Sequence, residues 1–85
     1  MSTTTRVEVE IGGEIYVLRG DAPAEHIIKV ANEVDRRIRE LIDRNPRLTL
    51  IKAAVLASLN IADELYKLQE SYESLVRVIE TEGVK

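Results

Sequence analysis

Few residues of this 85-residue chain are of the types that carry out chemistry. His26 is the only histidine and cysteine is absent, so neither a Cys/His zinc site nor a catalytic dyad can be assembled. The pair Gly12-Gly13 could belong to a phosphate-binding loop, but no Gly-Lys-Ser/Thr follows it and a strand pattern does. We therefore expect no enzyme activity, no metal site and no cofactor, with His26 as an exposed or capping residue.

Charged side chains are stronger candidates for function, because they are unevenly placed. From Arg36 to Lys52 six basic residues stand against two acidic ones, a local charge of +4 in a chain of net charge −3. The basic residues are Arg36, Arg37, Arg39, Arg44, Arg47 and Lys52. They could simply stabilise a helix end through its dipole, or form a docking corner for an acidic protein surface. Nucleic acid is a weaker candidate, because no aromatic residue interleaves with the arginines and the net charge opposes it.

Asn60 is a polar residue in the most apolar stretch of the chain, AVLASLNIADEL. We expect a buried amide that hydrogen-bonds a backbone group of the N-terminal strands or its own symmetry mate, thereby fixing register. Direct contact with another protein is the alternative. Ser58, two residues earlier, is expected to permit close approach of a second helix.

The N-terminal part of the chain reads as a β-hairpin between Arg6 and Arg19. Two β-branched runs flank Gly12-Gly13, which can supply the positive φ angles of a two-residue turn. Facing pairs would be Ile11 with Glu14, Val9 with Tyr16 and Val7 with Leu18. Since both faces of this hairpin carry apolar residues, we expect one to meet the chain's own helix and the other a second subunit.

Two helices follow the hairpin in the predicted α+β fold. The first begins after Asp21–Pro23, with Asp21 as a candidate cap, and ends at Asn45-Pro46, because the residue before proline is driven out of helical conformation. The second runs from about Thr49 to Glu82, with Gly83 as its stop.

The second helix is too long for a compact domain of this size. Its 34 residues span ~51 Å at 1.5 Å per residue, whereas an 85-residue globule is only about 30 Å across. Apolar and small side chains follow an unbroken three-four spacing along it, which predicts an intermolecular coiled coil. These positions are Ile51, Ala54, Ser58, Ile61, Leu65, Leu68, Tyr72, Leu75 and Ile79. We name residues 1–62 the head and residues 63–85 the stalk. A lone chain of this size would be marginally stable, so oligomerisation is also expected on energetic grounds.

At this point the residues resemble the ZapA family of bacterial cell-division proteins, in its short-tailed form. The resemblance rests on the hairpin VEVEIGGEIYVL, the segment VANEVDRRIREL, the loop and core NPRLTLIKAAVLASLNIADEL and the tail YKLQESYESL. It implies a homodimer, often paired into a homotetramer, that binds the tubulin-like polymer FtsZ and bundles its filaments in the division ring. The charged head positions that match the family's filament-binding surface are Arg44, Arg47 and Lys52, with Glu14 at the hairpin turn.

The function expected from this resemblance is that of a non-enzymatic scaffold in the cytoplasm, at the mid-cell division site. No apolar run approaches the ~20 residues of a membrane span, and the N-terminal residues lack the apolar region of a signal peptide. Two alternatives remain at this stage. One is a small dimeric nucleic-acid-binding regulator that uses the corner from Arg36 to Lys52, and the other is a dimerisation module of a larger enzyme.

Overall fold

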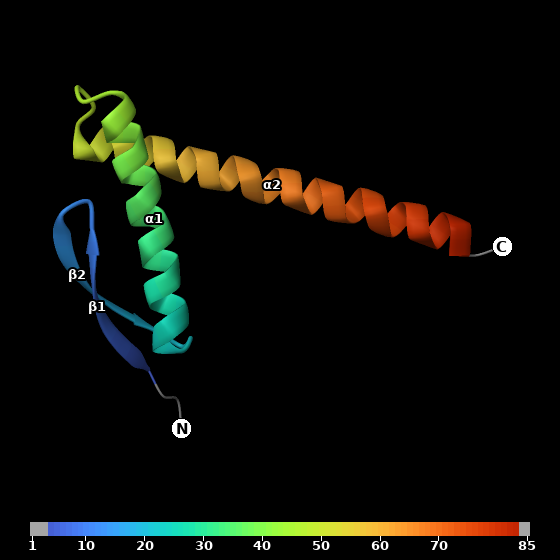
Figure 1. Ribbon diagram of the computed structural model, residues 1–85. Coiled ribbons are helices and arrows are strands. Elements are labelled where there is room, and N and C mark those ends of the chain that lie inside the picture. The colour runs from blue at the N-terminus through green and yellow to red at the C-terminus, as the bar shows by residue number, and fades with distance from the viewer. Residues whose placement is uncertain (1–3, 84–85) are drawn as a thin grey trace.

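The computed structural model describes residues 4–83 and consists of a hairpin followed by two helices (Figure 1). Strand β1 is Thr5–Ile11, β2 is Glu14–Gly20, helix α1 is Ala24–Arg44 and α2 is Leu50–Gly83. The α+β class and the order of the elements are confirmed. Pro23 occupies the N-cap of α1 and no side chain caps that end, so the prediction that Asp21 caps it is wrong. Asp21 lies two residues before the N-cap.

The hairpin has the predicted turn and register. Gly12 and Gly13 have φ angles of +62° and +87°, as a two-residue turn between twisted strands requires. Ile11 pairs with Glu14, Val9 with Tyr16 and Val7 with Leu18. Val9 is buried, whereas Ile15 and Val17 on the opposite face are exposed. Within one chain, therefore, only one face of the hairpin is covered.

The core lies where α1 crosses the beginning of α2. Ile38 of α1 packs with Ala53 and Ala57 of α2, and all three side chains are buried. Partly buried apolar side chains, among them Ile11 and Leu50, surround this cluster and join the hairpin turn to both helices. The alanines let the two helix backbones approach closely.

Helix α2 continues far beyond this core and projects away from α1 and the hairpin (Figure 1). The molecule measures 56 × 44 × 14 Å, with a radius of gyration of 17.9 Å. A compact chain of this length would have a radius of gyration near ~12 Å. The prediction of a projecting helix is confirmed. In the part of the chain that the structure describes, no helix is long and apolar enough to cross a membrane.

Candidate functional site

The six basic residues of the predicted corner fall into two groups in the structure. Three of them pair with carboxylates along α1 or across to α2. Arg36 contacts Glu33 and Glu40 at 2.5 and 2.7 Å, and Arg39 contacts Asp35 at 2.8 Å. Arg37 contacts Glu33 at 2.7 Å and also reaches Glu64 of α2. These ion pairs neutralise half of the cluster, so the nucleic-acid alternative gains no support from the structure.

Arg44, Arg47 and Lys52 form the second group, and among residues 4–83 no carboxylate pairs with them. All three are exposed and lie around the connection between α1 and α2. The backbone here is well tethered: the Arg47 N–H donates to the Asn45 side chain at 3.2 Å, and the Lys52 N–H to Thr49 Oγ1 at 3.2 Å. Free cationic side chains on a fixed backbone suit recognition of an acidic surface.

The hairpin turn lies beside this connection. The Gly12 N–H donates to Asp35 Oδ1 at 2.9 Å, and a Cβ atom at Gly12 would lie only 2.6 Å from Leu50 Cδ1, at the start of α2. Glu14 is therefore held at the same end of the head as Arg47 and Lys52. Its carboxylate accepts a hydrogen bond from the Tyr16 hydroxyl, which raises the pKa of Tyr16. We name Glu14, Arg44, Arg47 and Lys52 the loop patch.

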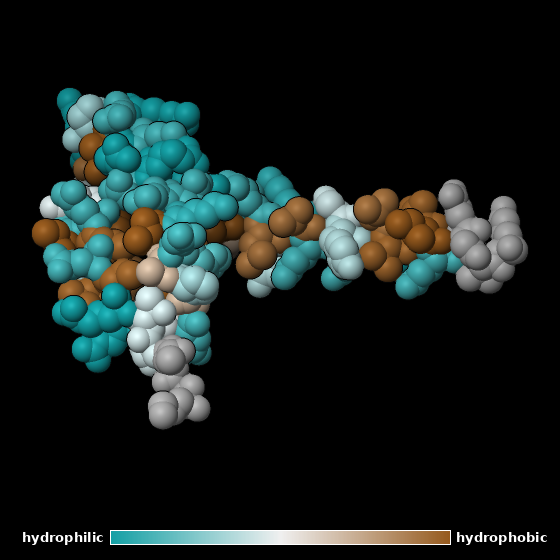
Figure 2. All heavy atoms as spheres, turned by 60° about the horizontal axis from the view of Figure 1, so that its bottom comes forward, coloured by the Kyte–Doolittle hydropathy of each residue, from teal (hydrophilic) through white to brown (hydrophobic). Residues whose placement is uncertain are grey.

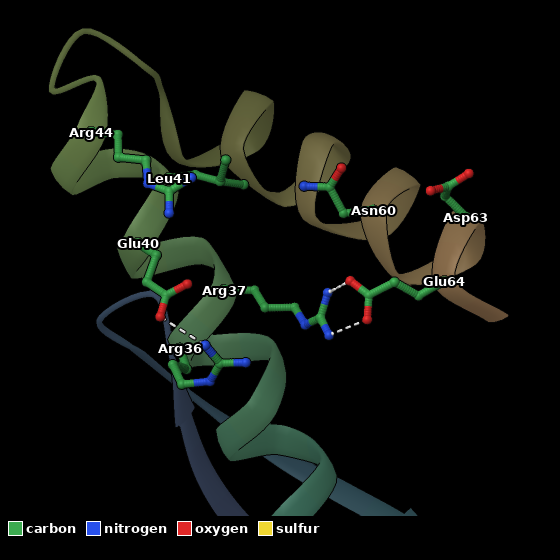
Figure 3. Close-up of a pocket in the computed structure, with 8 residues that line it drawn as sticks. All are labelled: Arg36, Arg37, Glu40, Leu41, Arg44, Asn60, Asp63 and Glu64. Carbon is green, nitrogen blue, oxygen red and sulfur yellow. Dashed lines mark hydrogen bonds and ion pairs between the residues drawn. The ribbon is translucent and has the colours of Figure 1, made fainter. Parts of the chain in front are cut away.

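Arg44 differs from the rest of the loop patch, because its side chain lines a pocket between α1 and α2 (Figure 3). The pocket encloses about 290 Å³, and its charged groups carry both signs. Its lining residues are Arg36, Arg37, Glu40, Leu41, Arg44, Asn60, Asp63 and Glu64. The hairpin turn that carries Glu14 thus lies next to the start of α2, close in the chain to Arg47 and Lys52, whereas Arg44 lines the pocket.

Asn60 is not buried in the chain, contrary to the prediction. It is exposed and lines this pocket, and its side chain makes no hydrogen bond with the hairpin or with any other described residue. Asn60 follows Ala53 and Ala57 at helical spacing on the side of α2 that faces α1, but at this level the space between the helices is the pocket with its charged side chains. The predicted contact with a symmetry mate stays a prediction. Ser58 donates from its hydroxyl to the Ala54 carbonyl at 2.8 Å.

One ion pair in the pocket joins the two helices. The Arg37 guanidinium donates to both carboxylate oxygens of Glu64, at 2.5 and 2.8 Å (Figure 3). These bonds lower the pKa of Glu64, and together with Glu33 they raise the pKa of Arg37. Hydrogen bonds from Arg36 and then Arg37 lower the pKa of Glu33 to about 2. This bridge between helices was not predicted, because periodicity shows only pairs within one helix.

The predicted coiled-coil positions form a largely uncovered row along α2. Ala54 and Ile61 are partly buried in the head, and the other seven positions are exposed. Leu68, Tyr72 and Leu75 in the stalk are 68%, 67% and 58% exposed. Figure 2 shows apolar side chains gathered along the projecting rod. An isolated helix with such an apolar row lacks the packing that stabilises helices in proteins, so the row calls for a partner.

A second set of exposed apolar side chains lies outside this row. Val55, Leu59 and Tyr66 of α2 are 54%, 61% and 65% exposed, and Ile15 and Val17 of the hairpin are also uncovered. In the head, from Leu50 to Ala62, apolar residues occupy nearly all sides of α2. Only the structure shows that α1 covers one side of it.

The structure gives His26 no special surroundings. It is exposed in the first turn of α1. Within residues 4–83 no three His, Asp or Glu side chains lie close enough together to hold a metal ion.

Comparison with known proteins agrees with these features. The family model described as cell division protein ZapA matches residues 7–83. A cell division protein ZapA of Geobacillus sp. (strain WCH70) is 40% identical over 78 residues, covering 92% of this chain and 90% of that protein. The corresponding protein of Bacillus pumilus (strain SAFR-032) is 39% identical over 71 residues, 84% of each chain.

A solved structure is also similar. It is a ZapA mutant dimer from Geobacillus stearothermophilus, with a TM-score of 0.74 and 36% sequence identity over 94% of this chain and 93% of that chain. The likeness extends over the hairpin and both helices, since little of either chain is left out.

Proposed function

The chain belongs to the ZapA family of cell division proteins, and on this premise we propose that it is a non-enzymatic scaffold that binds FtsZ and cross-links its filaments in the division ring. In this proposal it acts in the cytoplasm at mid-cell, as a homodimer or a homotetramer. Residues 1–62 form the head that touches the filament, and residues 63–85 form the stalk.

The observation that carries this proposal is the exposed apolar row on the projecting part of α2. The row begins in the head at Ile51 and continues through Leu65 along the projecting part of α2 to Ile79. Beyond the head no element of the described residues covers it, so we assign that place to a second copy of α2. Self-association agrees with the dimeric state of the similar solved structure. Pairing through the row would form the coiled coil.

An oligomer built in this way carries several heads on one rod. Each head can bind a filament weakly, and tethering makes the second contact intramolecular, so that overall binding is much stronger. The loop patch is the surface we assign to the filament, because no carboxylate among residues 4–83 pairs with its cations. The chain does not need to catalyse a reaction for this role.

The test is co-sedimentation of the purified chain with FtsZ and GTP, with electron microscopy of the pellet. We expect the chain to enter the pellet with filaments and to convert single filaments into bundles. Pelleting of FtsZ without the chain, at concentrations where the chain is oligomeric, would contradict the proposal.

A further inference from the structure

We propose that Arg37 and Glu64 are positioning residues that set the angle between head and stalk, and thereby the spacing between the filaments that one oligomer joins. The inference rests on the proposed function for its consequence, the spacing. The angle itself is a property of the chain and can be measured without FtsZ.

The contact between these residues has the geometry of a fork. Two guanidinium nitrogens of Arg37 in α1 donate to the two carboxylate oxygens of Glu64 in α2, 27 residues further along the chain. The third guanidinium nitrogen, Nε, donates to Glu33 Oε2 at 2.7 Å, which anchors the group to α1. The Arg37 side chain is only 21% exposed. Such a bidentate ion pair, which we call the fork, restricts the relative orientation of the two side chains as well as their distance, because both groups are planar.

The remaining side-chain contacts between α1 and α2 are apolar. Ile38 is buried against Ala53 and Ala57, with partly buried side chains packed around them, and such packing restricts an interhelical angle less sharply than a directional bidentate pair. Among residues 4–83, no other side-chain hydrogen bond or ion pair joins α1 to α2. Glu64 is the second residue of the stalk, and its carboxylate faces Arg37 of α1 (Figure 3).

The stalk acts as a lever on any change at this point. Glu80 lies 16 residues beyond Glu64, ~24 Å along the helix. A rotation of ~10° at the fork would therefore displace that end by ~4 Å, given the same rise per residue. In the proposed oligomer the paired stalks connect the heads, so a change of this angle would change the distance between heads.

The experiment measures distances between spin labels on α1 and α2. The chain has no cysteine, so Asn32→Cys and Gln69→Cys, both at exposed positions, introduce two labels without competition. Labelled chains are diluted with unlabelled ones, so that pulsed electron paramagnetic resonance reports the distance within one chain. Circular dichroism checks that helix content is unchanged.

Two variants break the fork in different ways. Glu64→Gln removes the charge, and Arg37→Lys keeps the charge but cannot form a fork. We expect a narrow distance distribution in the parent chain and a distribution at least ~1.5-fold broader in both variants, because the fork fixes direction. Glu73→Gln, the same change at an exposed position of α2 outside the fork, should leave it narrow. A parent-like distribution in either fork variant would overturn the inference.

Filament spacing is measured separately, by electron microscopy of FtsZ bundles. The fork variants should give irregular spacing, and Glu73→Gln regular spacing. Regular spacing with a broadened label distribution would overturn the link to spacing. Failure of the parent chain to form bundles would contradict the proposed function and leave the label measurement as the test of the fork.

Discussion

Arg44, Arg47 and Lys52 differ from the other basic residues of the corner, because no carboxylate in the described part of the chain satisfies them. Arg36, Arg37 and Arg39 carry the same charge but form ion pairs with carboxylates of the same chain. At the scale of single residues, the local charge of +4 thus combines arginines that already form ion pairs within the chain with basic residues that do not. Only the second group is a candidate for binding a partner.

We predict that Arg44→Glu combined with Arg47→Glu weakens co-sedimentation with FtsZ at least ~10-fold, because it turns attraction to an acidic surface into repulsion. The oligomer mass measured by light scattering should stay the same. Arg19→Glu with Lys29→Glu is the matched control, with the same charge change at exposed positions away from the loop patch. Equal pelleting of both double variants would remove the loop patch from consideration.

Glu33 should make the stability of the chain depend on pH in the acid range. Its pKa in the folded chain is about 2, against an ordinary value of 4.5. Because the pKa is lower in the folded state, the ionised Glu33 contributes fully to the free energy of unfolding above about pH 4.5. This contribution is lost as the pH falls toward 2. Urea unfolding at fixed protein concentration should show this decline, and Glu33→Gln should make it shallower. An unchanged slope in Glu33→Gln would show that other carboxylates account for the decline.

At the scale of elements, the junction of three segments at Gly12 organises the head. The turn donates to Asp35 of α1 and lies against Leu50 of α2, so hairpin and helices share one fixed point. The backbone at Gly12 has positive φ, which disfavours any side chain, and the space for a Cβ atom is already taken.

We predict that Gly12→Ala lowers the free energy of unfolding by about 2–3 kcal/mol, from the strained φ together with displacement of Leu50. Gly13→Ala is the matched control: its φ is also positive, but nothing lies within 4 Å of the added Cβ atom, so only the strain of about 1 kcal/mol remains. If urea unfolding showed equal losses of unfolding free energy in the two variants, the contact with Leu50 would make no contribution to stability.

At the scale of the whole molecule, two sides of α2 serve two purposes. One side packs on α1 in the head through Ala53 and Ala57, and another carries the row that continues exposed along the stalk. The shape that results, with extents of 56 × 44 × 14 Å, has a small core and a long uncovered arm. Such a chain is completed by a second copy of itself.

Leu75→Glu should disrupt the stalk, because it places an unpaired charge within the predicted row. We expect self-association to weaken by more than about 2 kcal/mol, at least the cost of deleting a buried leucine side chain. Light scattering should then show a lower mass at the same concentration. Ser74→Glu, an exposed position outside the row, is the control and should retain the parent mass. An unchanged mass for Leu75→Glu would count against the stalk.

The sequence by itself determined the elements, the Gly12-Gly13 turn, the hairpin register and the apolar row, because each follows from local backbone preference or from periodicity within one segment. It also singled out Arg44, Arg47, Lys52 and Glu14, although through a family resemblance. Only the tertiary structure decided which arginines are already paired, that Asn60 faces a pocket, and that Arg37 reaches Glu64. These features depend on how α1 and α2 cross, which is decided by contacts between residues far apart in the chain, such as Ile38 with Ala53 and Arg37 with Glu64, and not by any local pattern.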